Sequence, residues 1–462
     1  MGLTLDKRGE TSFIILERSP VGGGTWYDNL YPGCECDVPS HLYSLRIGKP
    51  YDWPQRYAQR QDIWTYIQRE SRRIHQHIQF NTTVTDAQFD TKTQRWRIVL
   101  NTGLSLYSQF LINASGPLSQ PYYPSIQNRE LFTGPQWHTA RWPEKASWSN
   151  LRIALIGTGS SAIQLLPKLV PDAKSITLFQ QTAPWVLPKR NRIYHPLTRV
   201  SLLRFRLLRF IYRYYLRVSQ EFKGIAFFYP SLMKQLETRQ RSRLKKLIKD
   251  DVLREQVSPQ QTMGCQRIIL SDEYYTALQN PKVSLCTNPI VQCTLNGIKT
   301  DTNHQRFDLI IWATGFNYQS PELNHVIRNT NGERIDEVWG PEKEAYLGCM
   351  VADFPNYFML LGPNTGSGHQ SILLAMEYQT RWIIDIIQYA DHHNLKGFSV
   401  KKEWAQKDQE DILRRFKTTV WNQNCHGWYY NVGGKNTALW PGFTGSYLKK
   451  TKMWRPNDFN WT

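Results

Sequence analysis

A glycine-rich turn near the middle of the chain has the residue types and spacing of a dinucleotide site. The apolar run 151–156 leads into a G-x-G-x-x-A turn and then into a helical pattern at 163–169. In such a turn the first glycine permits a tight bend, and the second lets backbone approach a pyrophosphate. The N–H groups that open the helix then face the phosphates. This context favours a bound dinucleotide over an empty turn. The candidate contacts are Gly157, Thr158, Gly159, Ser160, Ser161, Ala162 and Ile163.

The residues after the next strand bear on which coenzyme binds. The predicted strand 175–179 ends at Gln180 and Gln181, where an NAD site commonly has an acid for the ribose hydroxyls. Because no acid stands here, we expect a coenzyme with a 2′-phosphate, NADPH, beside Gln180 and Gln181. Lys189, Arg190 and Arg192 lie close in sequence and could meet that phosphate.

A second dinucleotide unit is expected at the start of the chain. Residues 12–17 form a short apolar strand that ends at Glu17, and an acid at this place in an FAD-binding unit accepts hydrogen bonds from the adenosine ribose. The matching glycine turn should precede Glu17 by about 20 residues, which falls before Met1. We therefore expect the first strand and its turn to be missing, with 2–9 as the helix after them. This predicts an incompletely defined gene or an inactive remnant, unless Glu17 is an ordinary surface acid.

The elements that must position these residues alternate between strand and helix. This alternation predicts an α/β fold with two Rossmann-like dinucleotide-binding domains, in which the first βα turn of the FAD domain is missing. The expected segments are an incomplete FAD-binding segment at 1–143, an NADPH-binding domain at 144–300, and a second FAD-binding segment with a C-terminal tail at 301–462. A helical insertion is expected at about 194–256. Further predictions are an antiparallel strand at 95–98, a buried strand at 308–312 and a long helix at 371–389.

Composition and charge narrow the class of protein. A hydrophobic content of 40% predicts a folded globular chain, and the net charge of +19 could attract anionic partners. The densest basic stretch, 198–217, has six arginines among apolar residues. A solvated helix that covers a substrate channel is the preferred interpretation, and a basic amphipathic face on a membrane is the alternative. We expect no nucleic-acid partner.

The seven cysteines are scattered, and no second pair accompanies the C-x-C at Cys34 and Cys36. This spacing does not match a metal site, so we expect no metal and a reduced protein. The first residues do not resemble a secretory signal, and no apolar run is long enough to span a bilayer. We therefore expect a cytoplasmic protein.

Five patches between residue 17 and about residue 368 resemble the Baeyer–Villiger monooxygenases within the wider flavin-containing monooxygenases. The most specific is 132–143, which matches F-x-G-x-x-x-H-x-x-x-W-P in full. Its Trp142 and Pro143 favour the ketone-oxidising branch over enzymes that hydroxylate N or S, which stay the alternative. The other patches are 23–43, 157–164 with 180–182, 264–275, and 313–316 with 354–369. His138 stands at a conformational position of the family, so we do not expect it to be catalytic.

The resemblance implies a set of site residues. The family has its active-site arginine at the position of Arg267, and Asp37 is its expected partner. The implied FAD contacts are Glu17, Gly24, Thr25, Trp26, Tyr27, Asp28, Asn29, Asp37, Tyr43 and Val84. Glu35, Cys36 and Asp37 join the glycine turn and Gln180–Gln181 as implied NADPH contacts.

The implied reaction uses FAD, NADPH and O₂ to insert one oxygen atom beside a ketone carbonyl, which gives an ester or lactone. The aromatic-rich insertion and tail suggest a bulky polyketide- or terpenoid-type ketone. Two positions depart from the family, which commonly has Arg at Gln181 and Lys at Gln266 on the 2′-phosphate. Each lost charge-assisted contact is worth roughly 1.5–3 kcal/mol, so the preference for NADPH over NADH stays open. An inactive remnant that binds no FAD is a further alternative.

Overall fold

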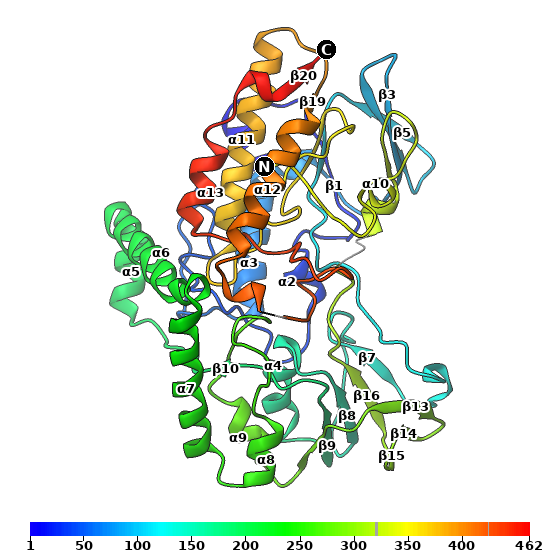
Figure 1. Ribbon diagram of the computed structural model, residues 1–462, viewed down its shortest axis with the longest axis vertical. Helices are drawn as coiled ribbons and strands as arrows, with labels where there is room; N and C mark the ends of the chain where they lie inside the picture. Colours follow the sequence, from blue (N-terminus) through cyan, green and yellow to red (C-terminus); the bar gives the residue numbers. More distant parts are fainter. Residues whose placement is uncertain (319–321, 424) are drawn as a thin grey trace.

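The computed structural model describes residues 1–318, 322–423 and 425–462 and has two lobes (Figure 1). The lower lobe in that view contains a five-stranded, fully parallel sheet. All four residues of its strand β16 (Leu309–Trp312) are buried, as expected for a parallel sheet covered on both faces. In spatial order the strands are β12 (Val283–Cys286), β9 (Ser175–Phe179), β8 (Arg152–Ile156), β16 (Leu309–Trp312) and β7 (Gln136–His138).

This sheet draws strands from all three of the segments expected from the sequence. β7 lies in the expected first segment and β16 in the expected last one, yet both strands pair within the lower sheet. The chain therefore joins this sheet before residue 144 and leaves it after residue 300. A small antiparallel sheet leads into β16 and consists of β13 (Ile290–Thr294), β14 (Gly297–Thr300) and β15 (His304–Arg306).

The upper lobe holds two short parallel pairs of strands. β1 (Ile15–Leu16) pairs with β2 (Ile78–Gln79), and β6 (Leu111–Asn113) pairs with β18 (Tyr357–Met359). Within the described residues no strand pairs with the other edge of β1 or of β6. The described residues therefore hold two separate parallel pairs here, with no strand that joins them. The helix expected at 2–9 is α1 (Gly2–Lys7).

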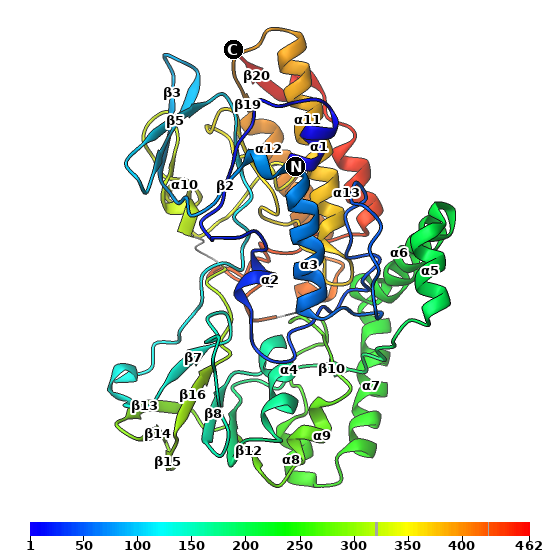
Figure 2. The ribbon, with the colours of Figure 1, turned by 180° about the vertical axis from the view of Figure 1, so that it is seen from behind.

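Other elements cover the upper lobe. The antiparallel strand expected at 95–98 is β4 (Arg95–Leu100), which lies between β3 (Val84–Asp90) and β5 (Ser105–Ser108). Seen from behind, α3 (Arg60–Ser71) runs beside the N-terminus (Figure 2). The long helix expected at 371–389 is α11 (Ile372–His392). The remaining named elements of this lobe are α2 (Thr25–Asp28), β17 (Ile327–Arg328), α10 (Ile335–Trp339), β19 (Phe398–Val400), α12 (Lys402–Phe416), α13 (Thr444–Thr451) and β20 (Phe459–Trp461).

The expected helical insertion is present and projects from the side of the molecule. It consists of α5 (Pro196–Arg204), α6 (Arg206–Phe228), α7 (Pro230–Leu247) and α8 (Asp251–Gln256). Proline at the first helical position begins both α5 and α7, where its missing N–H costs no hydrogen bond. α5 and α6 extend away from both lobes in both views (Figures 1 and 2). Among the described helices, none has the length and apolar character needed to cross a bilayer.

A disulfide corrects the expectation of a fully reduced protein. Cys265 and Cys425 are joined, with their Cα atoms 5.0 Å apart, whereas the other five cysteines are free. The two partners are separated by 160 residues in sequence, so no local spacing could indicate this pair. The bridge connects the loop before β11 (Ile269–Leu270) to the segment between α12 and α13.

Candidate active site

Arg267 and Asp37 form an ion pair although 230 residues separate them. The Nε and Nη2 atoms of Arg267 lie 2.7 and 2.6 Å from Oδ2 of Asp37. Both side chains are partly exposed, at 33% and 23%. The carboxylate of Asp37 raises the pKa of Arg267 above its ordinary value, more than burial lowers it. The guanidinium is therefore a permanent positive charge with a fixed orientation, beside partly accessible space.

Tyr429 is a third member of this cluster, which the sequence analysis missed. Its side chain is 2% exposed, and the charges of Arg267 and Asp37 both act on its hydroxyl. Burial raises the pKa of Tyr429 to about 12; Arg267 lowers it, and Asp37 raises it further. At neutral pH the residue is therefore an uncharged hydroxyl. Its only sequence signal is its place in the aromatic-rich tail, which does not identify a partner.

The loop that carries Arg267 is held by the C-terminal segment at several consecutive residues. Besides the disulfide at Cys265, Nε1 of Trp421 donates to the carbonyl of Gly264 over 3.0 Å. Nε2 of Gln266 reaches the carbonyl of His426 at 3.5 Å. We call residues 264–267 with 421–423 and 425–429 the clasp. Because the clasp holds the three residues before Arg267, it fixes the backbone from which this guanidinium reaches Asp37.

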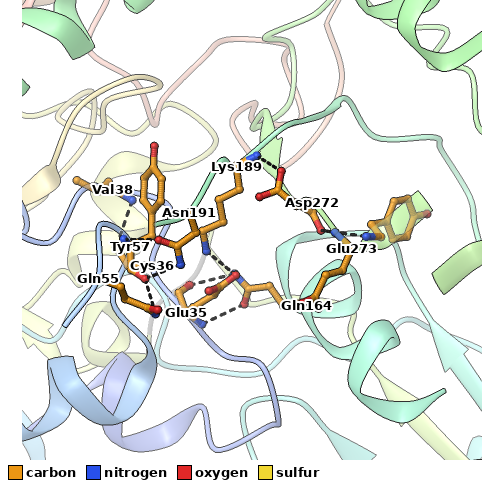
Figure 3. Close-up of polar contacts among 12 residues, drawn as sticks. Glu35, Cys36, Val38, Gln55, Tyr57, Gln164, Lys189, Asn191, Asp272 and Glu273 are labelled. Atoms are coloured by element: carbon orange, nitrogen blue, oxygen red, sulfur yellow. Dashed lines mark hydrogen bonds and ion pairs between the residues drawn. The ribbon is translucent and has the colours of Figure 1, made fainter. Parts of the chain in front are cut away.

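The segment before Asp37 packs against the coenzyme-binding unit (Figure 3). Gln164 on α4 (Ser160–Leu169) donates to the carbonyl of Glu35 over 3.0 Å, and its side-chain oxygen accepts from the N–H of Glu35. Cys36 is buried, and its Sγ accepts from the N–H of Val38. Burial raises the pKa of the Cys36 thiol to about 12, so it is protonated at neutral pH. These contacts place Asp37 at the junction of the two lobes.

Lys189 does not have the environment that the sequence analysis expected. Its ammonium forms an ion pair with Glu35 and lies 5.3 Å from the centre of the Tyr57 ring. Its backbone N–H donates to Asp272 over 2.9 Å (Figure 3). The side chain is 4% exposed, so it is committed to these partners. Lys189 therefore braces the Asp37 segment.

The glycine turn after β8 has the geometry that a pyrophosphate requires. Gly157 has φ +108°, and a Cβ built there would lie 2.5 Å from the carbonyl oxygen of Ala313. A Cβ on Gly159 would meet no atom within 4 Å, so open space adjoins the start of α4. Thr158 Oγ1 donates to the carbonyl of Thr182 over 2.9 Å. Free N–H groups and open space at a helix start suit a phosphate, so the turn fits a dinucleotide. Of the other expected contacts, Ser160 and Ser161 are half-buried, whereas Ala162 and Ile163 are buried.

A pocket lies at the carboxyl end of β9, where an adenosine ribose is expected. Its lining includes Gln180, Gln181, Gln266 and Glu255, and no Lys or Arg is among the lining residues that the structure describes. Gln180 is fixed, because its Nε2 donates to a backbone carbonyl of α8 over 2.8 Å. Since Lys189, Arg190 and Arg192 are not among the lining residues, the structure does not bring the three expected cations to this pocket.

The implied flavin contacts at 25–43 form one cluster. Nε1 of Trp26 donates to the hydroxyl of Tyr43 over 3.1 Å, and Asn29 donates to the carbonyl of Thr25. Asp28 lies 3.6 Å from Arg141 of the fingerprint, and burial raises the pKa of Asp28. The left-handed φ of +50° at Gly24 begins α2, which carries Tyr27.

Two implied FAD contacts lie elsewhere in the upper lobe. Glu17 accepts the N–H of Ser19 over 2.8 Å directly after β1. Val84 begins β3, pairs with Leu100 and packs against the core of the antiparallel sheet. Neither contact tests flavin binding, so both roles stay predictions.

His138 lies in β7, the strand that crosses into the lower sheet. It is 1% exposed, and its Nδ1 accepts the N–H of Ala140 over 3.1 Å. Burial lowers the pKa of His138 to about 4, so the ring is neutral at pH 7. The ring is neutral and buried in a strand that connects the lobes. Its conformational, non-catalytic role stays a prediction from the resemblance.

Comparisons with known proteins agree with this geometry. Residues 45–419 match the model of the flavin-binding monooxygenase-like family. The chain is 33% identical to a Baeyer–Villiger monooxygenase of Pseudomonas aeruginosa, over 100% of this chain and 89% of that protein. It is 34% identical to the FAD-binding monooxygenase ktnD of Aspergillus niger, over 97% and 77%. A solved structure of oxidized steroid monooxygenase bound to NADP superposes with a TM-score of 0.89 at 25% identity, covering 100% of this chain and 96% of that one. The chain therefore belongs to the flavin-binding monooxygenase-like family.

Proposed function

We propose that this chain is an FAD- and NADPH-dependent monooxygenase of the Baeyer–Villiger type, which converts a ketone to an ester or lactone. The observation that carries the proposal is the oriented guanidinium of Arg267, held by Asp37 at the junction of the lobes. The names of relatives from Pseudomonas aeruginosa and Streptomyces coelicolor support the same reaction. When bound, FAD and NADPH supply the hydride transfer and the activation of O₂.

The residues of the chain supply binding and electrostatics. Arg267 stabilises negative charge that develops on oxygen, and an arginine suits this task because it does not lose its proton. Asp37 orients the guanidinium through the contact at Nε and Nη2. Tyr429 supplies a buried, uncharged hydroxyl whose pKa the charge of Arg267 affects.

The cofactor contacts follow from the same residues. The space beside Gly159 and the start of α4 would hold the NADPH pyrophosphate. The Trp26–Tyr43 cluster would hold the flavin ring, and Glu17 would bind the adenosine ribose of FAD. A bulky apolar ketone is the proposed substrate class. Trp428 supports it, because this partly exposed ring adjoins Tyr429 and packs on Tyr318 with centroids 4.9 Å apart.

Arg267→Ala tests the central residue. With FAD bound, we expect NADPH to reduce the flavin in the variant, as followed by flavin absorbance, while ester formation falls by at least about a hundredfold. Arg267→Lys should recover little activity, because an ammonium cannot reproduce the two-nitrogen contact. Arg239→Ala, which removes an exposed arginine on α7, is the matched control and should leave the yield unchanged. An unchanged ester yield in Arg267→Ala would contradict the proposal.

Product analysis and a test of FAD binding separate the two other possibilities. An N- or S-oxide in place of an ester would assign the chain to the heteroatom-hydroxylating branch. A purified protein that stays colourless after addition of FAD would assign it to the remnant that binds no flavin. Both assays use the full chain.

A further inference from the structure

The exposed side of α6 is apolar, which reverses the usual arrangement of a surface helix. A surface helix normally directs its apolar stripe to the core and its charged side chains to water. Here four apolar residues at spacings of i, i+3, i+4 and i+7 are 54–71% exposed. We call them the outer stripe: Leu207, Phe210, Ile211 and Tyr214.

Three of the four arginines of the same helix, Arg209, Arg213 and Arg217, contact other parts of the chain. Nη1 of Arg209 donates to the carbonyl of Leu202 at the end of α5, over 2.8 Å. Arg213 lies 3.6 Å from Glu377 on α11, and Arg217 lies over the ring of Tyr378, 5.9 Å from its centre. These polar contacts attach α6 to the body of the molecule. These contacts therefore keep the outer stripe on the outside of the molecule. The four side chains of the stripe are not buried against other parts of the chain.

The end of the helical pair adds charge to this surface. The turn between α5 and α6 is Arg204-Phe205-Arg206, and all three side chains are exposed. Leu197 and Val200 on α5 are exposed as well. Residues 196–220 contain six arginines and no Asp or Glu, in a chain of net charge +19. An apolar stripe with a positively charged end is complementary to a surface whose outer layer is negatively charged and whose next layer is apolar.

We propose that the α5–α6 hairpin docks on an anionic lipid bilayer, with the outer stripe in the interface and Arg204 and Arg206 at the lipid headgroups. The hairpin projects beyond both lobes, so a flat surface can reach it without contact from the rest of the molecule (Figures 1 and 2). Tyr214 has the apolar ring and polar tip that suit the interface. The hairpin lies on the bilayer and does not cross it.

A second copy of the chain fits this surface less well. A symmetric contact through the outer stripe would bring like patches together. Such a contact would pair two hairpins that each carry six arginines and no Asp or Glu between residues 196 and 220. Like charges brought together oppose such a dimer, whereas they favour an anionic bilayer.

Vesicle flotation of the full chain tests the proposal. We expect binding to vesicles of phosphatidylcholine with phosphatidylserine, weaker binding to phosphatidylcholine alone, and a loss of binding at high salt. Phe210→Ser with Ile211→Ser should lower the ratio of bound to free protein by at least about tenfold, since two exposed side chains lose apolar area. The matched control, Leu104→Ser with Tyr107→Ser, changes equally exposed residues beside and within β5 and should bind as wild type.

Two charge-reversal variants test the contact with the lipid headgroups. Arg204→Glu with Arg206→Glu should lower binding to the anionic vesicles by more than about fivefold for each arginine. Lys245→Glu with Lys246→Glu on α7 makes the same change in net charge at another exposed place and should have a much smaller effect. The thermal midpoints should match wild type, because every changed side chain is exposed.

Four outcomes would overturn the proposal or its assignment to anionic lipid. The first is no binding to anionic vesicles, and the second is binding that both hairpin variants leave unchanged. The third is a concentration-dependent dimer in light scattering that Phe210→Ser with Ile211→Ser abolishes, without vesicle binding, which would assign the outer stripe to a second copy. Equal binding to both kinds of vesicle would overturn the assignment to anionic lipid.

Discussion

Removal of the Cys265–Cys425 bridge should destabilise the protein by several kcal/mol. The bridge closes a loop across 160 residues of sequence separation. The chain-entropy relation gives about 5 kcal/mol for a loop of this length, and measured effects are commonly about 2–4 kcal/mol. The bridge also holds the loop of Arg267 through the clasp, so its loss should loosen this residue along with the fold.

The assay has two stages. In denaturant without reductant, thiol titration should find five reactive groups among the seven cysteines. Urea unfolding should then show a lower midpoint for Cys265→Ser with Cys425→Ser than for wild type, and reductant should lower the wild-type midpoint by a similar amount. Cys286→Ser, which changes a free cysteine in β12, is the control and should respond to reductant as wild type does. Titration of seven thiols, or an unfolding midpoint insensitive to reductant, would refute the reasoning.

Three further predictions concern single side chains. Gly157→Ala should lower stability, because its Cβ would lie 2.5 Å from a backbone carbonyl oxygen. Gly159→Ala should fold normally, because its methyl group enters open space, and calorimetry should show weaker NADPH binding. His138, with a pKa of about 4 when folded and about 6.5 when unfolded, contributes stability that is fully present above pH 6.5 and falls as the pH drops toward 4. His138→Gln should therefore reduce the wild-type loss of unfolding free energy between pH 7 and pH 5 by roughly 2 kcal/mol, measured by urea titration. Asp37→Asn should lower ester formation about tenfold or more, because Arg267 loses a charged partner; an unchanged product rate would remove Asp37 from the site.

Local patterns predicted the elements of the fold well. The strand 175–179 has the predicted bounds, and the glycine turn lies between strand and helix as its sequence indicates. These features depend on residues close in sequence, whose spacing sets the period of a strand or the bend of a turn. The membership of β7 and β16 in one sheet was not predicted, because pairing between distant strands leaves no local pattern.

In the candidate site, too, some features were predicted from the sequence and contacts between distant residues were not. The family resemblance indicated Asp37 as the partner of Arg267, and the structure brings the two side chains together. Tyr429 was missed because its contact crosses from the tail to the middle of the chain. Proximity in sequence to Gln181 did not indicate the ion pair that Lys189 forms with Glu35, because it does not fix the direction of a side chain.

The arginine cluster draws on the beginning, the middle and the end of the polypeptide. During synthesis, Asp37 leaves the ribosome first, Arg267 follows, and Tyr429 comes nearly last. Domains form as the chain emerges, so a nascent chain can complete much of its fold before this charge has all its neighbours. The guanidinium of Arg267 therefore gains its last neighbour only when translation is almost finished.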